Sequence, residues 1–192
     1  TYQNNSAMYR MFRGIEAIRM GNEGEALEHF AIAVGLEPDN VLLLRTVGAV
    51  VLRRKGYGIA IICYNKLCEL LPDVKAYAIN QCLCLAATGD TKTAVNKAYE
   101  LNLNNESDNQ VKRLLAWVLI CNGNAEKALN IYNELINTDK QPDDALNMAY
   151  AYWISGNPTE AKNSFTEWLI NHPGANLEHE FENDSYVFKP NG

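Results

Sequence analysis

The sequence predicts an all-α protein made of about five antiparallel pairs of helices that stack in chain order. The first observation is self-similarity, because the same residue types return with a period of about 34 residues along the chain. The second is that apolar residues recur every three or four positions within each half-period, which is helical spacing. The third is a glycine near the middle of the copies, where a residue with positive φ commonly ends a helix.

Each copy of the period predicts a tight helical hairpin. In the first copy Gly14 lies in the first helix, and Ala26 and Phe30 lie in the second. Facing small residues let two helices approach closely, and the apolar face that each hairpin leaves uncovered requires a stacked neighbour. The copies span residues 7–40, 41–74, 75–108, 109–141 and 142–175, and their paired small residues are Gly14 with Ala26, Gly48 with Ala60, Cys82 with Ala94, Ala116 with Ala128, and Ala149 with Ala161.

The turn chemistry agrees with two helices in each copy. In the second copy the turn glycine is displaced by one position, to Gly56. In the last copy Asn157, Pro158 and Glu160 are typical of an N-cap, a first-turn proline and a capping-box acid. The other turn glycines are Gly21, Gly89, Gly123 and Gly156.

The two ends of the chain depart from the repeat. Residues 1–6 form a polar N-terminal extension, in which Asn5 or Ser6 is expected to cap the first helix. Residues 176–192 form a tail in which acidic and aromatic residues alternate. This tail could cap the last hairpin, link to a following domain, or lie in a groove as a mimic of a ligand. Its informative residues are Glu178, Glu180, Phe181, Glu182, Asp184, Tyr186, Val187 and Phe188.

Composition excludes several classes of partner. The formal net charge of −6 argues against a surface that neutralises phosphates, so no nucleic-acid partner is expected. Arg45 and the run Arg53, Arg54 and Lys55 interrupt the most apolar region, so no membrane span is predicted either. The chain starts at Thr1 without a leader, which suggests a mature form or a piece of a longer protein.

The cysteines favour a reducing compartment. There are five, an odd number, in apolar helical surroundings rather than in the loop framework of a secreted disulfide fold. A cytoplasmic location is therefore favoured, and the thiols are expected to behave as small buried apolar groups.

No motif in the sequence predicts catalysis or a cofactor. The three histidines, His29, His172 and His179, are scattered along the chain. There is no glycine-rich phosphate loop, no zinc-protease motif and no paired CxxC motif. We therefore expect a non-enzymatic protein with no metal and no cofactor.

The repeated positions resemble the tetratricopeptide repeat family, whose pattern is a small residue, a large apolar residue, a turn glycine, an alanine, an aromatic residue and a proline. The resemblance covers residues 7–175 and implies a right-handed superhelical solenoid. In that family the first helix of each pair lines a concave groove. Its outward positions, transferred residue by residue, give the candidate partner-binding residues Phe12, Arg19, Arg45, Arg53, Asn80, Leu83, Arg113, Trp117, Asn147, Tyr150 and Trp153.

These residue types suggest a protein or peptide partner that is apolar and carries acidic residues. Aromatic rings and arginines often dominate protein recognition, and a guanidinium can bind a carboxylate through two parallel hydrogen bonds. Each ring could equally be part of the core, and each arginine could pair with a neighbouring acid. The two-carboxylate clamp of some family members is not expected, because Ala49, Gln110 and Leu114 replace clamp residues although Arg45 and Asn80 match.

The expected function is accordingly a scaffold that binds another polypeptide. A structural or self-oligomerising module, which would make the chain a homo-oligomer, is one alternative. An accessory domain of a larger protein is another.

Overall fold

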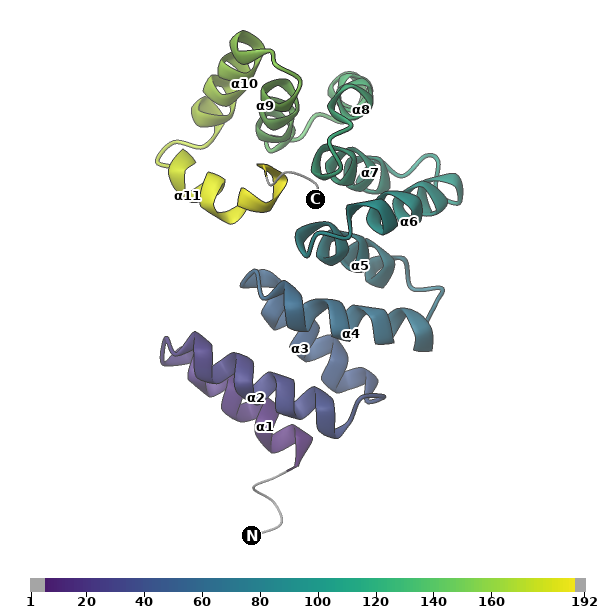
Figure 1. Cartoon of the computed structure of the whole chain (residues 1–192), viewed down its shortest axis with the longest axis vertical. Helices are drawn as coiled ribbons and strands as arrows, with labels where there is room; N and C mark the ends of the chain where they lie inside the picture. The colour runs from purple at the N-terminus through teal and green to yellow at the C-terminus, as the bar shows by residue number, and fades with distance from the viewer. Residues whose placement is uncertain (1–5, 189–192) are drawn as a thin grey trace. The chain divides into compact units, whose positions relative to one another are not determined.

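The computed structural model describes residues 6–188, in which the chain forms eleven α-helices, a short closing 3₁₀ helix and no strand (Figure 1). This confirms the predicted all-α fold class. Each repeat contributes two helices, as its apolar spacing requires. The helices are α1 (Ala7–Arg19), α2 (Glu23–Leu36), α3 (Val41–Arg53), α4 (Tyr57–Leu70), α5 (Lys75–Ala87), α6 (Thr91–Leu103), α7 (Asn109–Cys121), α8 (Ala125–Thr138), α9 (Asp144–Ile154), α10 (Pro158–Asn171), α11 (Leu177–Asn183) and η2 (Ser185–Phe188).

The chain divides into two compact units, Thr1–Cys84 and Leu85–Gly192, and the division falls within α5. In the first unit α1 packs on α2 and α3 packs on α4, while α2 also contacts α3 and α4. In the second unit α7 contacts α6, α8, α9 and η2, and α9 packs on α8 and α10. Each unit therefore repeats one packing pattern, a hairpin stacked on the next hairpin.

Small residues in the first helices make room for aromatic rings of the second helices. A Cβ atom added to Gly14 would lie 2.6 Å from the ring of Phe30, and one added to Gly48 would lie 3.2 Å from the Cβ of Cys63. The alanines predicted to face these glycines, Ala26 and Ala60, are both buried. In the first two hairpins the tight contact thus includes the ring four residues after the alanine, Phe30 or Tyr64.

The turns between paired helices use the left-handed backbone region as predicted. Gly21, Gly89, Gly123 and Gly156 have φ values of 78°, 98°, 80° and 80°. The second repeat differs from the prediction, because Lys55 adopts φ 59° whereas Gly56 has φ −77° and is the N-cap residue of α4. The left-handed residue therefore occurs at the same position of the repeat as in the other copies. The left-handed conformation of a non-glycine residue there raises the free energy of the folded chain by about 1 kcal/mol.

Side-chain capping hydrogen bonds are present at several helix starts, but α4, α8, α9 and α10 begin without one. The Ser6 hydroxyl accepts a hydrogen bond from the Tyr9 amide at 3.1 Å, whereas Asn5 lies outside the described residues. Pro158 begins α10 as predicted, but the Asn157 side chain accepts no capping hydrogen bond. That helix start depends instead on the φ that proline fixes in advance.

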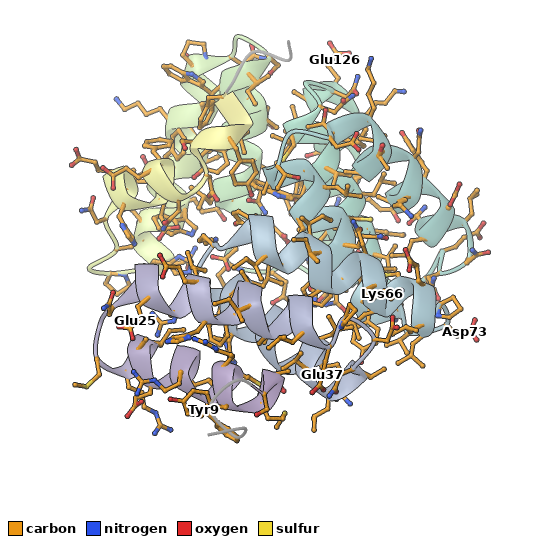
Figure 2. The ribbon with its side chains drawn as sticks, turned by 60° about the horizontal axis from the view of Figure 1, so that its bottom comes forward. Tyr9, Glu25, Glu37, Lys66, Asp73 and Glu126 are labelled. Atoms are coloured by element: carbon orange, nitrogen blue, oxygen red, sulfur yellow. The ribbon has the colours of Figure 1, made fainter. Side chains whose placement is uncertain are left out.

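The second helices carry charge on the protein surface. Figure 2 shows Glu25 on α2, Lys66 on α4 and Glu126 on α8 at the surface of their helices. The ammonium group of Lys66 lies 3.0 Å from Asp39 and 3.2 Å from Glu69. Such exposed pairs contribute little to stability, so these faces are mainly solvated. Among residues 6–188, no helix is both long enough and apolar enough to cross a bilayer.

Candidate functional site

An open groove of about 600 Å³ lies between α1 and α3 in the first unit. Ile15 and Ile18 of α1 and Val50 of α3 contribute apolar side chains to it. Arg19, Arg53 and Arg54 line the same groove and bring positive charge to it. We call these six residues the α1/α3 groove.

Two of the three guanidinium groups in the α1/α3 groove have no acidic partner within residues 6–188. Arg54 is paired with Glu23 at 3.0 Å. Arg19 and Arg53 are exposed, and no carboxylate of the described residues pairs with either. The groove therefore combines an apolar lining with two cations whose hydrogen-bonding groups remain available to a ligand.

The apolar surface of α1 continues beyond the α1/α3 groove. A second open hollow, about 500 Å³ in volume, shares Ile15 and Arg19 with the groove and adds Phe12, whose exposed fraction is 60%. Leu42 of α3 is 61% exposed. Arg45 of α3 is also exposed and has no acidic partner among the described residues, but it does not line the groove.

The two candidates on α5 are less available than those on α1 and α3. The Asn80 side chain forms a hydrogen bond with Tyr64, which is buried in the core of the first unit. Burial raises the pKa of Tyr64, and the Asn80 hydrogen bond opposes that effect. Leu83 is half-buried. Asn80 therefore has a partner inside the protein.

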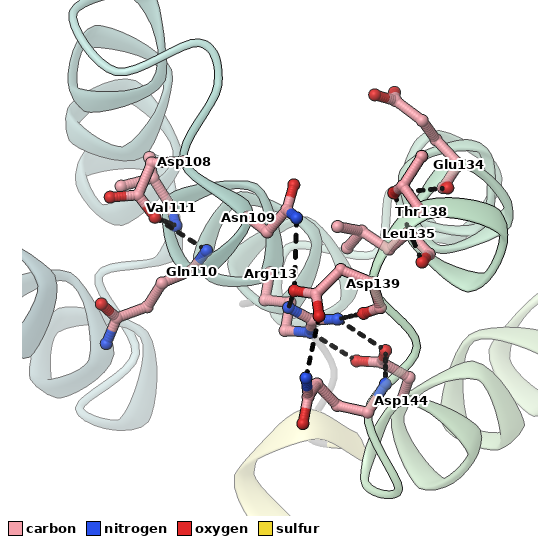
Figure 3. Close-up of polar contacts among 11 residues, drawn as sticks. Asp108, Asn109, Gln110, Val111, Arg113, Glu134, Leu135, Thr138, Asp139 and Asp144 are labelled. Carbon is pink, nitrogen blue, oxygen red and sulfur yellow. Dashed lines mark hydrogen bonds and ion pairs between the residues drawn. The ribbon is translucent and has the colours of Figure 1, made fainter.

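Arg113 is the centre of a polar network in the second unit (Figure 3). Its guanidinium Nε and one terminal nitrogen donate to the two carboxylate oxygens of Asp144 at 2.8 and 3.0 Å. It also donates to the Asp139 carboxylate at 2.9 Å and to the Asp139 backbone carbonyl. The backbone N–H of Gln141 donates to the Asp144 carboxylate at 2.9 Å, and the Asn109 side-chain amide donates to the Asp139 carboxylate at 3.2 Å.

This network joins α7 to the turn between α8 and α9. Asp144 is only 2% exposed, so its negative charge requires the paired guanidinium. Hydrogen bonds to Asp144 and then to Asp139 raise the pKa of Arg113. The same pairing lowers the pKa of the Asp139 carboxyl. The structure thus places the Arg113 charge in an internal contact.

Trp117 and Tyr150 lie in contact in the second unit. Their ring centroids are 6.2 Å apart, and Phe165 of α10 is 6.0 Å from Tyr150. We call Trp117, Tyr150 and Phe165 the aromatic platform. Trp117 is half-buried and Tyr150 is completely buried. The platform thus brings together two predicted binding residues, Trp117 and Tyr150, and adds Phe165, which was not among them.

The chain's own C-terminal segment, which we define as residues 176–188, covers the aromatic platform. Phe181 and Phe188 lie 5.8 and 5.4 Å from the Tyr150 ring, and Tyr186 meets Trp117 edge-on at 6.3 Å. In Figure 1, α11 lies beside α9 and α10. The burial of Tyr150 is therefore partly due to this segment.

The remaining candidates on α9 have different surroundings. The Asn147 side chain is half-buried, and the buried Tyr132 hydroxyl has no hydrogen-bond partner among the described residues. Trp153 is 59% exposed, with its ring largely in solvent. Trp153 is therefore accessible, whereas Asn147 is partly covered.

The sequence pattern did not predict the acidic partners of Arg113, and it left the placement of the C-terminal segment open. The acidic partners of Arg113 lie 26 and 31 residues away, in a turn where the run Asp143, Asp144 was the visible signal. The contact between the C-terminal segment and the platform was only one of three open alternatives. The alternation of acidic and aromatic residues in the tail was the feature of the sequence that indicated this contact.

The described residues contain no group of three or more histidine, cysteine or acidic side chains that could hold a metal. The thiols of Cys63 and Cys84 are buried, and burial raises the pKa of each to about 12. These thiols are therefore protonated at neutral pH. His172 stacks on Trp168 with ring centroids 4.7 Å apart, which is a packing contact.

Known structures with the same fold are numerous, although their sequences differ widely. A thermophilic tetratricopeptide repeat protein of Thermus thermophilus, TTC0263, matches 96% of this chain and 100% of its own, with a TM-score of 0.62 and 15% identity. MamA of Desulfovibrio magneticus matches over 88% of this chain and 97% of its own, with a TM-score of 0.59 and 16% identity. YrrB, described as a tetratricopeptide repeat protein with an unusual peptide-binding site, matches over 93% of both chains, with a TM-score of 0.56 and 16% identity.

No known family profile and no curated protein sequence matches the chain. The likeness is therefore one of fold. The repeated hairpins, the left-handed turn glycines and the matching structures agree with the resemblance seen in the repeat pattern. By its fold, the chain is a tetratricopeptide-repeat-like protein.

Proposed function

We propose that this protein is a non-enzymatic scaffold that binds a segment of another polypeptide in the α1/α3 groove. The observation that carries the proposal is an apolar groove lined by two arginines, Arg19 and Arg53, that have no acidic partner among residues 6–188. The expected ligand is an apolar segment with carboxylates spaced to meet both guanidinium groups.

Apolar and charged contacts would have different roles in this binding. Ile15, Ile18 and Val50 can remove apolar ligand side chains from water, at about 25 cal/mol for each Å² buried. Guanidinium groups bind carboxylates with defined geometry and so select acidic segments. Because exposed ion pairs are individually weak, the arginines would contribute more to selectivity than to total affinity.

Two matching structures are consistent with this proposal. The description of YrrB names a peptide-binding site. PilW, a pilus biogenesis factor, matches over 92% of this chain and 82% of its own, with a TM-score of 0.60 and 16% identity. Their known roles belong to those proteins, and the groove chemistry described above is the reason to extend peptide binding to this chain.

The first prediction concerns Arg19 and Arg53. The Arg19→Glu/Arg53→Glu variant should bind a fluorescent peptide of leucine and glutamate at least about tenfold more weakly than the native chain. The reason is that attraction between the guanidinium groups and the peptide carboxylates is replaced by repulsion, and a tenfold loss corresponds to about 1.4 kcal/mol of binding free energy. Fluorescence anisotropy measures the affinity. A peptide with lysine in place of glutamate should bind the native chain poorly and the variant better.

The matched control changes net charge equally but leaves the groove intact. Lys127 and Lys162 are exposed residues of the second unit, and the Lys127→Glu/Lys162→Glu variant should bind the acidic peptide like the native chain. Equal losses in both double variants, with unchanged helical circular dichroism, would show that the groove is not the site. Light scattering tests the self-oligomerisation alternative, because a monomer at all concentrations that still binds the peptide contradicts it.

A further inference from the structure

We infer that the aromatic platform is a second binding site, selective for acidic segments with spaced aromatic residues, and that residues 176–188 occupy it as a ligand supplied by the chain itself. This inference concerns a different surface from the α1/α3 groove and does not depend on it. It assigns the C-terminal segment a role as an exchangeable occupant instead of a permanent part of the helical stack.

The contact surface is formed by matched sets of rings. The platform contributes Trp117, Tyr150 and Phe165 from three helices, and the C-terminal segment contributes Phe181, Tyr186 and Phe188. Several pairs meet edge to face, including Phe165 with Phe181 at 5.3 Å and an interplanar angle of 79°. Such geometry contributes about 0.5–1.5 kcal/mol per pair beyond the buried area.

A hydrogen bond gives the ring contact a polar anchor. The Tyr150 hydroxyl donates to the Asp184 carboxylate at 3.1 Å. Burial and then the Asp184 charge raise the pKa of Tyr150, so this hydroxyl stays protonated and remains a donor at neutral pH. An occupant of the platform therefore needs a carboxylate close to its aromatic side chains.

The C-terminal segment is only shallowly attached. No residue of α11 is buried, and in η2 only Val187 is buried, with 5% exposure. The segment's carboxylates at Glu178 and Glu182 are exposed. By contrast, α9 buries most of its residues, including Ala149 and Tyr150. An element with so few buried apolar groups opens more easily than the helices beneath it.

The linker allows the segment to leave without disturbing α10. Residues 172–175 join α10 to the C-terminal segment, and Gly174 has φ 90°, a conformation that favours glycine. A short flexible linker gives the tethered segment a high effective concentration, of the order of millimolar. An external ligand therefore binds only when the tethered segment is weakened or when the ligand has higher affinity.

The second prediction tests this competition in the full-length chain. A fluorescent peptide copying residues 176–188 should bind the Phe181→Ala/Phe188→Ala variant about a hundredfold more tightly than the native chain, because the variant's own segment no longer competes effectively. The Glu178→Gln/Glu182→Gln variant is the matched control. It changes two exposed residues of the same segment, keeps the rings, and should bind the peptide as poorly as the native chain.

Further substitutions locate the peptide. In the Phe181→Ala/Phe188→Ala background, Trp117→Ala should abolish peptide binding, whereas Arg19→Glu/Arg53→Glu should leave it unchanged. Loss of binding only in the arginine variant would overturn the inference and would place the acidic peptide in the α1/α3 groove. These variants therefore distinguish failure of this inference from failure of the binding function proposed for the α1/α3 groove.

Two other results would overturn the inference. One is a folded Phe181→Ala/Phe188→Ala variant that does not bind the peptide. The other is loss of hydrogen-exchange protection in α9 and α10 of this variant, because it would show that the segment is an integral cap whose removal unfolds the last hairpin. Retained protection together with peptide binding supports an exchangeable occupant.

Discussion

Arg113 shows how a residue suited to recognition can instead hold the fold together. Its guanidinium binds Asp144, the first residue of α9, through two hydrogen bonds and also binds Asp139 in the turn before that helix. Arg19 and Arg53 are the same residue type at corresponding faces of earlier first helices, yet no acid among the described residues pairs with them. The neighbouring turn, and not the residue type, decides which arginine remains available to a ligand.

The third prediction concerns the stability that Arg113 supplies. Arg113→Met should lower the free energy of unfolding of the second unit by about 3–5 kcal/mol, because it leaves the buried Asp144 carboxylate unpaired. Denaturant unfolding followed by circular dichroism measures this change. The control is Lys112→Met, which removes an exposed pair with Glu134 and should cost less than about 1 kcal/mol.

The effect of Arg113→Met should depend on pH in a defined direction. Because Arg113 lowers the pKa of Asp139 in the folded chain, this pairing stabilises the fold above the ordinary aspartate pKa of about 4. That stabilisation is lost as the pH falls through the lowered pKa. The stability difference between the native chain and Arg113→Met should therefore shrink below about pH 4. A difference that stays constant in acid would contradict the role given to Asp139.

At the scale of the helices, the first two hairpins each place a glycine of the first helix against an aromatic ring of the second helix. At Gly14 the Phe30 ring occupies the space that a side chain would need, so only glycine fits without displacing the ring. Gly24, in the second helix of the same hairpin, has no atom within 4 Å of its added Cβ. The same residue type thus has a packing role in α1 and none in α2.

The fourth prediction compares these two glycines. Gly14→Ala should destabilise the first unit by about 1–3 kcal/mol, because the new methyl group must displace the Phe30 ring. Gly24→Ala should be neutral or stabilising by no more than about 1 kcal/mol, because alanine has the higher helix propensity. Thermal unfolding of both variants tests the comparison. Equal effects would show that the contact with Phe30 is not limiting.

The whole molecule consists of two compact units whose helices contact mainly their neighbours in sequence. In repeat proteins, stability is approximately a sum of terms for single repeats and for neighbouring pairs. A local change should therefore have local consequences.

The fifth prediction follows from this organisation. Hydrogen exchange in Gly14→Ala should accelerate in α1–α4 and remain near native in α7–α10, and Arg113→Met should show the reverse pattern. The physical reason is that each repeat of such a protein is stabilised mainly by its immediate neighbours in sequence. Uniform acceleration throughout the chain in either variant would indicate one cooperative unit.

The sequence alone determined the all-α class, the hairpins and most of their turns, because each depends on residues a few positions apart. Helical apolar spacing and the left-handed glycines at positions such as Gly21 and Gly123 are local properties. The second repeat shows the limit of this reasoning. Residue type favours Gly56 for the left-handed conformation, but Lys55, which stands 34 residues after Gly21, adopts it.

Only the tertiary structure decided which candidate side chains remain available. Arg113 is engaged by acids 26 and 31 residues away, and Tyr150 is covered by a segment that includes its hydrogen-bond partner 34 residues away. Such contacts depend on how helices and turns stack in space. The repeat pattern indicates which face a residue occupies, but it carries no information on which distant charge or ring will meet it there.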